Sequence, residues 1–380
     1  DGVAPVLMFG SSFRDVDVYR NMIAMPMPEA RHLDCFLEWV ENGGRHVCQS
    51  LRASSKNGKE KGLVFGKEYG LEWDDLTPQL IWRGTDFGFL PTLQRRPSLV
   101  HPDARNYVQA PNNLRGNDIA RRRGAIEALN AKYDTLLPRW KGAALTAKAE
   151  LDAQQPGGKL PWADIKFTSY LEKGKSATAG SARYALWESV GVGVASGISL
   201  ADHARYKYHI DLGGGGGTTW SGTMEKLAMP GLLFHHFSPT KDYFHDRLEP
   251  YVHYVPISPD LSDLKDRYDW AEGNPQQAKE IADRATEFMR YLGTPEGFGQ
   301  LYEEEFVEPL RRIIDAYRPI STVNPGKSWT DVLDSEDSNM VRVIECSGLA
   351  KRSCAVIGKE AVERWKNCRG GYFCDVEVKK

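Results

Sequence analysis

Five consecutive glycines at residues 213–217 stand between two segments of different periodicity. Residues 205–212 alternate in character as a β-strand does, and a helix is expected to open at residues 218–221 and to run through Leu227. Glycines permit a tight turn here because they have no side chain to clash. Strands that alternate with helices are typical of layered α/β proteins with parallel sheets. This junction therefore predicts an α/β fold with a parallel sheet.

Other segments continue the alternation of strands and helices. Apolar runs and helical spacing predict buried strands over residues 3–9, 79–82 and 231–234, and helices over residues 29–42, 117–137, 275–292 and 296–317. In the last helix, an apolar stripe is expected to face inward at Tyr302, Phe306, Leu310 and Ile313. Residues 141–200 are rich in Ala, Gly, Lys and Ser, and they predict no element clearly.

Charge and hydropathy argue against two classes of protein, general nucleic-acid binders and proteins with a membrane span in this chain. The formal net charge is -2, whereas a general nucleic-acid binder usually carries a basic excess. No apolar run approaches the roughly 18 residues that span a bilayer. The sequence begins at Asp1, so a leader or a membrane anchor would have to lie outside this chain. We therefore expect no nucleic-acid partner and no membrane span within these residues.

The six cysteines fall into two groups. Cys35 and Cys48 form one, and the other four lie in a short polar tail, at Cys346, Cys354, Cys368 and Cys374. An even count with this crowding suits disulfides in an oxidising lumen. A zinc site is the alternative, but no CxxC or HxxxH pair is present. The cysteines favour a disulfide-bonded protein of the secretory pathway.

One candidate ligand site follows the predicted strand 79–82. In open parallel sheets, ligands bind beyond the carboxyl ends of strands. Arg83 is at such an end, and its guanidinium can hold a phosphate with two parallel hydrogen bonds. Gly84 lets the backbone approach, and Thr85 can donate a hydroxyl. The alternative is an arginine that forms a salt bridge at a sheet edge.

The glycine turn is the second candidate site. Its N–H groups and the N-terminus of the following helix form a cradle suited to a diphosphate. Ser221 and Thr223 add hydroxyl groups, and Lys226 adds a full charge one turn later. A flexible surface turn is the alternative. The spacing is neither a Walker P-loop nor GxGxxG, and a weaker dinucleotide-like pattern at residues 191–197 lacks a clear preceding strand.

Asp15 and Asp17 allow three interpretations. As an Asp-x-Asp pair they could hold a divalent metal against a diphosphate. One of the carboxylates could instead be a general base that deprotonates an acceptor hydroxyl. They could also lie in a solvated, helix-capping turn. We expect His235, His236 and the nearby histidines to lie in the core or on the surface and not to bind a metal, because neighbouring residues of a strand face opposite sides.

Taken in order, these segments resemble the protein O-glucosyltransferase family, which also contains the fungal capsule-associated xylosyltransferases. The resemblance covers about residues 79–95 and 200–292. It is carried by Ile81 to Thr85, the block DHARYKY from Asp202, Asp211 with the glycine turn, Trp220-Ser221-Gly222, GLLF from Gly231, LEPYVHYVPI from Leu248, and Leu261 to Leu264. Several members carry a phosphate-binding arginine where this chain has Thr223. Plant-like members lack that arginine and place a lysine nearby, as at Lys226.

The resemblance implies a GT-B-like fold, in which two Rossmann-like domains with parallel sheets face each other across a cleft. The expected parts are a partial, truncated or remodelled acceptor-side domain (1–75), a UDP-sugar-binding domain (76–295), a C-terminal helix packing back across the domains (296–325) and a Cys-rich tail (326–380). The family would bind its donor without a metal, here through Arg83, Gly84, Thr85, Thr218, Thr219, Trp220, Ser221, Gly222, Thr223 and Lys226.

The activity implied is inverting transfer of glucose or xylose from a UDP-sugar to a hydroxyl of a protein or glycan, in the lumen of the endoplasmic reticulum or Golgi. The resemblance makes Asp15 the expected catalytic base, with Asp17 in reserve. Two alternatives belong to other classes. One is a non-catalytic, lectin-like or scaffolding relative that keeps the fold, and the other is a nicotinamide-dependent oxidoreductase.

Overall fold

The computed structural model describes most of the chain between residues 70 and 316, together with short segments near both ends. The described residues are 6–9, 11–13, 22–25, 70–87, 123–124, 126–127, 136–154, 160–169, 195–214, 218–219, 221–238, 240–316, 326, 340–341, 343–347, 357–358 and 375–378. The predicted helix over 29–42 lies outside them, as does most of the predicted helix over 117–137.

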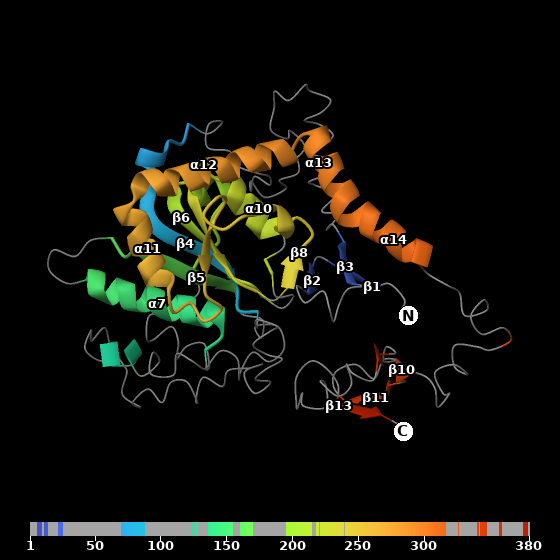
Figure 1. The fold of residues 1–380 in the computed structure, drawn as a ribbon. Helices are drawn as coiled ribbons and strands as arrows, with labels where there is room; N and C mark the ends of the chain where they lie inside the picture. The colour runs from blue at the N-terminus through green and yellow to red at the C-terminus, as the bar shows by residue number, and fades with distance from the viewer. Residues whose placement is uncertain are drawn as a thin grey trace.

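A five-stranded parallel sheet forms the centre of the molecule (Figure 1). Its strands lie in the order β5-β4-β6-β7-β9 and comprise Ala163–Ser169, Thr77–Thr85, Tyr206–Asp211, Leu232–His236 and Val255–Ile257. All four neighbouring pairs are parallel. The predicted α/β fold with a parallel sheet is confirmed.

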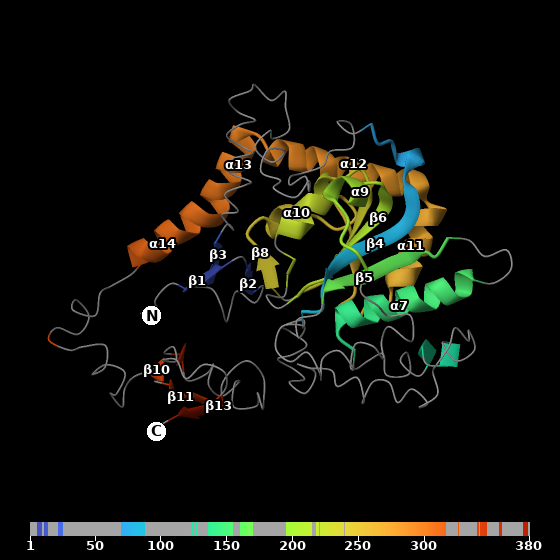
Figure 2. The ribbon, with the colours of Figure 1, turned by 180° about the vertical axis from the view of Figure 1, so that it is seen from behind.

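Helices cover both faces of the sheet. On one face, α7 (Pro138–Ala153) and α11 (Leu264–Gly273) join the main core with alternate residues of the strands. On the other face, α10 (Ser221–Ala228) packs through Met224 and Leu227 against Leu233 of β7. Figure 2, seen from behind, shows α10 and the short α9 (Leu200–His203) in front of the strands. Helix α12 (Pro275–Leu292) contributes residues to both cores.

The order of the strands creates one topological switch point. β4 is the first strand of the sheet along the chain, and the second and third strands, β5 and β6, lie on opposite sides of it. In open α/β sheets, ligands bind in the crevice outside the carboxyl ends of the two strands where the order reverses. The crevice here is at the ends of β4 and β6.

Several predicted elements have different boundaries in the structure. Arg83, Gly84 and Thr85 are the last residues of β4, not the turn after it, because their backbone pairs with β5. The predicted helix over 296–317 is three helical segments: α13 (Pro295–Tyr302), a π-helical segment (Glu303–Val307) and α14 (Glu308–Ala316). Within it the expected inward position of Tyr302 was wrong: this side chain is 38% exposed, whereas the preceding Leu301 is buried.

Two elements, α7 and β5, had no clear signal in the sequence. Most of α7 is buried, including its polar residues Lys141 and Thr146, so it has no simple polar face. Gly142 permits the helix to approach the sheet, since a Cβ at this position would lie 2.9 Å from Cγ2 of Ile165. A helix buried over most of its surface lacks the periodic contrast by which amphipathic helices are predicted.

Short strands near both ends complete the described structure. β1 (Val6–Phe9) pairs in parallel with β3 (Met22–Met25), and β2 (Ser11–Phe13) pairs antiparallel with β8 (Thr240–Asp242). Near the C-terminus, two antiparallel pairs join β10 (Met340–Val341) to β12 (Ile357–Gly358) and β11 (Val343–Ser347) to β13 (Asp375–Val378). Among the described residues, no helix combines the length and apolarity needed to cross a bilayer.

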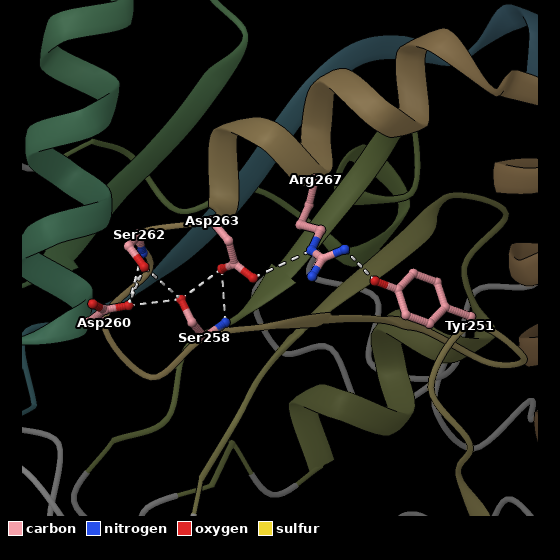
Figure 3. Close-up of polar contacts among 6 residues, drawn as sticks. All are labelled: Tyr251, Ser258, Asp260, Ser262, Asp263 and Arg267. Atoms are coloured by element: carbon pink, nitrogen blue, oxygen red, sulfur yellow. Dashed lines mark hydrogen bonds and ion pairs between the residues drawn. The ribbon is translucent and has the colours of Figure 1, made fainter.

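A polar turn leads from β9 into α11 (Figure 3). Asp260 accepts hydrogen bonds from the hydroxyls of Ser258 and Ser262 at 2.8 and 2.7 Å, and Asp263 accepts from the backbone N–H of Ser258 at 2.9 Å. Burial opposes the ionisation of Asp260, but the hydrogen bonds from Ser262 and Ser258 lower its pKa to about 2. Arg267 of α11 pairs with Asp263. These contacts fix the start of α11 at the carboxyl edge of the sheet.

Candidate functional site

Both predicted ligand-binding segments lie at the switch point. Arg83 to Thr85 end β4, and Asp211 ends the adjacent strand β6, directly before the glycine turn and α10. The two segments are about 130 residues apart in the sequence. They become neighbours because β4 and β6 pair in the sheet. The carboxyl edge of these two strands is therefore the candidate site.

Asp211 organises the polar side of this edge. Its carboxylate is buried and accepts three hydrogen bonds, from the Thr223 hydroxyl at 2.8 Å, His235 Nδ1 at 2.7 Å and the backbone N–H of His236 at 3.0 Å. Burial opposes ionisation, but His235, Lys226 and Thr223 hold the pKa of Asp211 well below its ordinary range. Asp211 is therefore a carboxylate that joins β6, β7 and α10.

The hydroxyls of the turn are engaged with protein groups. Thr218 donates to Oδ1 of Asp242 at 2.7 Å, and the Oγ1 atoms of Thr219 and Thr223 lie 2.5 Å apart. The backbone is ordered in the same way: the N–H of Gly214 donates to the Thr218 carbonyl, and that of Gly222 donates to the Thr219 carbonyl. These hydroxyls and N–H groups of the turn therefore already have protein partners, and an anion would be attracted chiefly by the N-terminus of α10.

Lys226 brings a positive charge beneath this helix terminus. Its side chain runs back along α10, and Nζ donates to the Gly222 carbonyl at 2.9 Å. Burial lowers the pKa of Lys226 below its ordinary value, and the nearby charge of Asp211 opposes this shift only in part. A Cβ on Gly222 would lie 3.3 Å from Nζ, so the glycine leaves room beside the ammonium group.

Arg139 of α7 is a part of the site that the sequence analysis missed. Its guanidinium donates to the carbonyl of Thr85 at 2.6 Å and to that of Leu212 at 2.9 and 3.1 Å, so it links the ends of β4 and β6. Burial lowers its pKa to about 10. The sequence carried no clear signal for α7, and with it none for the position of Arg139 in the first turn of that helix. A Cβ on Gly214 would lie 2.7 Å from Nη2 of Arg139.

Arg83 is held by an acidic partner in this structure. Its Nη2 forms a salt bridge of 2.5 Å with Asp164 of β5, and Nη1 donates to the Asp164 carbonyl at 2.6 Å. The pairing matches the salt-bridge alternative of the sequence analysis. Burial, together with the charges of Lys226 and Arg83, lowers the pKa of His203 to about 3. Arg83 alternates along β4 with Leu80 and Trp82 of the main core, so it faces the side of the sheet that carries α10.

Most histidines in the described part of the chain occupy core positions, namely His203, His209, His235, His236 and His245. His203 and His209 are buried with their rings 5.3 Å apart, and His235 lies between Asp211 and His245, at 4.5 Å from the latter ring. Burial lowers the pKa of His209 well below its ordinary value. Within the part of the chain that the structure describes, no three His, Cys, Asp or Glu side chains are grouped as metal ligands.

Some predicted site residues cannot be placed. Asp15, Asp17 and Trp220 lie outside the described residues, and Ser221 is described only as the first residue of α10. Gly84 is placed by packing, since a Cβ there would lie 2.5 Å from Cζ2 of Trp82. The site therefore comprises Arg83 to Thr85, Thr218, Thr219, Gly222, Thr223 and Lys226 from the prediction, with Arg139 and Asp211 added by the structure.

Comparison with known proteins found similarity in this region. A sequence model of Glycosyl transferase family 90 matches residues 174–292, which include β6, the glycine turn, α10 and α12. Protein O-glucosyltransferase 1 of Homo sapiens is 32% identical over 104 residues, which are 27% of this chain and 26% of that protein. Protein O-glucosyltransferase 2 of Danio rerio is 34% identical over 99 residues, 24% of this chain and 18% of that protein. The match thus spans about a quarter or less of these relatives' length.

The solved structures that match include the crystal structure of Anabaena Alr3699/HepE in complex with UDP-glucose. The identity is 13%, the TM-score is 0.28, and the match covers 56% of this chain and 54% of that one. A likeness this slight carries no argument, so the two-domain GT-B arrangement stays a prediction. The sequence matches are confined to one region: residues 174–292 match the model of Glycosyl transferase family 90, and about a quarter of the chain is similar to protein O-glucosyltransferases.

Proposed function

We propose that this chain is a UDP-sugar-dependent glycosyltransferase whose donor diphosphate binds at the carboxyl ends of β4 and β6. The observation that carries the proposal is the position of the glycine turn. It leads from Asp211 into the N-terminus of α10 at the switch point of the sheet, inside the family 90 region. Backbone N–H groups, a helix N-terminus and the buried Lys226 are the groups that a diphosphate requires.

The same groups would assist the reaction. In an inverting transfer, an acceptor hydroxyl attacks the anomeric carbon, the bond to the diphosphate oxygen breaks, and negative charge develops on the departing UDP. Donors that are already positioned stabilise this charge, and the loss of one typically raises the barrier by about 3 kcal/mol. Lys226 and the turn supply such donors without a metal. Arg83 would join them by leaving Asp164 for the phosphate.

The N-terminal segment would supply the base. Asp15 is our candidate for removing the acceptor proton, with Asp17 as the alternative. β2 ends two residues before Asp15 and pairs with β8, whose Asp242 binds Thr218 of the turn. This pairing supports a base that reaches the donor site from the N-terminal segment.

The donor sugar would be glucose or xylose, and the acceptor a hydroxyl of a protein or glycan. Relatives named protein O-glucosyltransferases support glucose and a protein acceptor. A lumenal compartment of the secretory pathway, the endoplasmic reticulum or Golgi, suits the six cysteines, which we expect to form disulfides there.

Binding and hydrolysis of nucleotide sugars test the proposal without a known acceptor. Calorimetry should show that the chain binds UDP. The chain should also hydrolyse UDP-glucose or UDP-xylose slowly, and a metal chelator should leave the rate of hydrolysis unchanged. UDP binding without transfer or hydrolysis would favour a lectin-like or scaffolding relative. A strict manganese requirement would favour the Asp15–Asp17 metal interpretation, and a chain that binds no UDP would refute the proposal.

Lys226→Met tests the donor site itself. Methionine keeps the length of the buried side chain but removes its charge, so UDP affinity should fall about ten- to a hundredfold, the effect of losing roughly 1.5–3 kcal/mol of a charged hydrogen bond. Lys279→Met is the matched control, because Lys279 lies on the surface of α12 in a pair with Asp283. Normal UDP affinity in a folded Lys226→Met protein would rule out this diphosphate site.

A further inference from the structure

The hydroxyls of Thr219 and Thr223 and the carboxylate of Asp211 form a chain of hydrogen bonds with a fixed direction. Asp211 accepts hydrogen bonds from Thr223, His235 and the backbone N–H of His236, as an ionised carboxylate does, and a carboxylate only accepts hydrogen bonds. The Thr223 hydroxyl therefore donates its single proton to Asp211 Oδ2, over 2.8 Å. Since Thr223 has no second proton, its 2.5 Å contact with Thr219 requires that Thr219 be the donor. The proton of Thr219 is thus committed inward, toward Thr223.

This direction decides what Thr219 can recognise. With its proton engaged, the Thr219 oxygen has only lone pairs left for a ligand. Phosphate oxygens are acceptors too, so Thr219 is a poor partner for the diphosphate. A hydroxyl group of the ligand is the complementary partner, because it has a proton to donate. A nucleotide sugar carries such hydroxyls on its ribose and on its transferred sugar.

Two described features of Thr219 favour this contact, its partial exposure and the glycine at position 222. Thr223 is buried at 1% exposure, whereas Thr219 is only partly buried at the turn. A Cβ on Gly222 would lie 3.9 Å from the Thr219 oxygen and 3.3 Å from Lys226 Nζ. Glycine at 222 therefore keeps open the region between an acceptor oxygen and a cation. A diphosphate at Lys226 would place its attached sugar hydroxyls within the same region.

We infer that Thr219 is a specificity-determining residue, whose oxygen accepts a hydrogen bond from a hydroxyl of the bound nucleotide sugar. Asp211, acting through Thr223, is the positioning residue that makes Thr219 an acceptor. The inference rests on the proposed function and adds to it the chemistry that the turn selects: a donor rich in hydroxyls, in addition to the anion held by N–H groups and Lys226.

Binding ratios test this inference and identify which hydroxyl is involved. In the wild-type chain, calorimetry compares UDP with 2′-deoxy-UDP and 3′-deoxy-UDP for the ribose, and UDP-glucose with UDP for the sugar. In Thr219→Val the advantage of the hydroxylated ligand should fall about fivefold in one of these comparisons, the effect of one hydrogen bond. Thr219→Ser keeps the oxygen and should restore the ratio. The location of the fall distinguishes ribose from transferred sugar.

Further variants distinguish a role of Thr223 in positioning Thr219 from a general effect on stability. Thr223→Val interrupts the chain and frees the Thr219 proton, so the same ratio should fall, and Thr223→Ser should restore it. Thr286→Val is the control, because Thr286 donates to the Met229 carbonyl elsewhere and its loss should leave every ratio unchanged. A general loss of stability would weaken all ligands together and would not move the ratio.

The possible results distinguish a failure of the proposed function from a failure of the role inferred for Thr219. A wild-type chain that binds no UDP overturns the proposed function, and the role of Thr219 with it. A chain that binds UDP, but whose Thr219→Val variant keeps every wild-type ratio, overturns the role of Thr219 and leaves the proposed function standing. Wild-type ratios in a folded Thr223→Val protein refute the positioning role of Asp211.

Discussion

Trp82 fills the space that a side chain at position 84 would need. Its indole is buried, meets the ring of Phe167 edge-on at a centroid distance of 6.0 Å, and lies under the guanidinium of Arg139. The sequence suggested a different reason for Gly84, the approach of a ligand to the backbone. Packing alone is enough to require glycine here, and the role in ligand binding stays a prediction.

Gly84→Ala should destabilise the protein. The new Cβ would lie 2.5 and 2.7 Å from two indole carbons, so Trp82 or the strand must shift, and overpacking of this kind typically costs about 1–3 kcal/mol. Urea unfolding of the variant measures the change. Gly299→Ala is the control, since nothing lies within 4 Å of a Cβ on this residue of α13, and alanine favours helix there by up to about 1 kcal/mol. An unchanged midpoint for Gly84→Ala would show that the indole yields freely.

At the scale of secondary-structure elements, one arginine joins α7, the end of β4 and the start of the glycine turn. Arg139 extends from α7 to the carbonyls that end β4 and start the glycine turn. The strands on either side of the switch point are therefore fixed to each other by a side chain of the crossover helix. This arrangement holds Leu212, and with it the entry to the turn, in one position before any ligand binds.

Arg139→Met should lower both the stability of the protein and its affinity for UDP. The variant leaves the buried carbonyls of Thr85 and Leu212 without this donor, which should lower the free energy of unfolding by about 1–3 kcal/mol. UDP affinity should fall too, because the turn loses its anchor at Leu212. Arg205→Met is the comparison variant, since Arg205 is 65% exposed in a surface pair with Asp202. If Arg139→Met lost stability but kept full UDP affinity, Arg139 would be structural only.

At the scale of the whole molecule, buried imidazoles make stability depend on pH. Burial lowers the pKa of His203 to about 3 and that of His236 to about 4, and it lowers that of His209 well below its ordinary value. In the unfolded chain a histidine titrates near 6.5. Between these values the unfolded state binds more protons than the folded state, so stability rises with pH.

The contribution of these histidines should be complete above about pH 6.5 and should be lost progressively as the pH falls toward about 4. Each should lower the free energy of unfolding by roughly 1 kcal/mol per pH unit in this window. Urea unfolding at intervals from pH 7.5 to 5 measures the slope, in a range where most carboxylates stay ionised. A flat profile over this range would mean that the histidines are hydrated or already charged in the folded protein.

Local pattern was sufficient for several elements. The strand Tyr206–Asp211, the helix Ser221–Ala228 and the helix Pro275–Leu292, which begins at a proline, follow from residues adjacent in the chain. The same is true of the position of the turn directly before α10. Glycine runs, proline at a first helical position and apolar periodicity act over a few residues. The sequence therefore contained the parallel α/β class, whereas anion binding by the turn stays a prediction.

Tertiary structure decided which of these local pieces meet. The order β5-β4-β6-β7-β9 brings Arg83 beside the turn and gives Asp211 its partner His235, 24 residues away. It also places Arg139 between two strand ends and pairs Arg83 with Asp164. Strand order depends on long-range pairing and on the burial of whole faces, which no window of sequence contains. Composition and spacing thus determined the kinds of group available, and packing determined their partners.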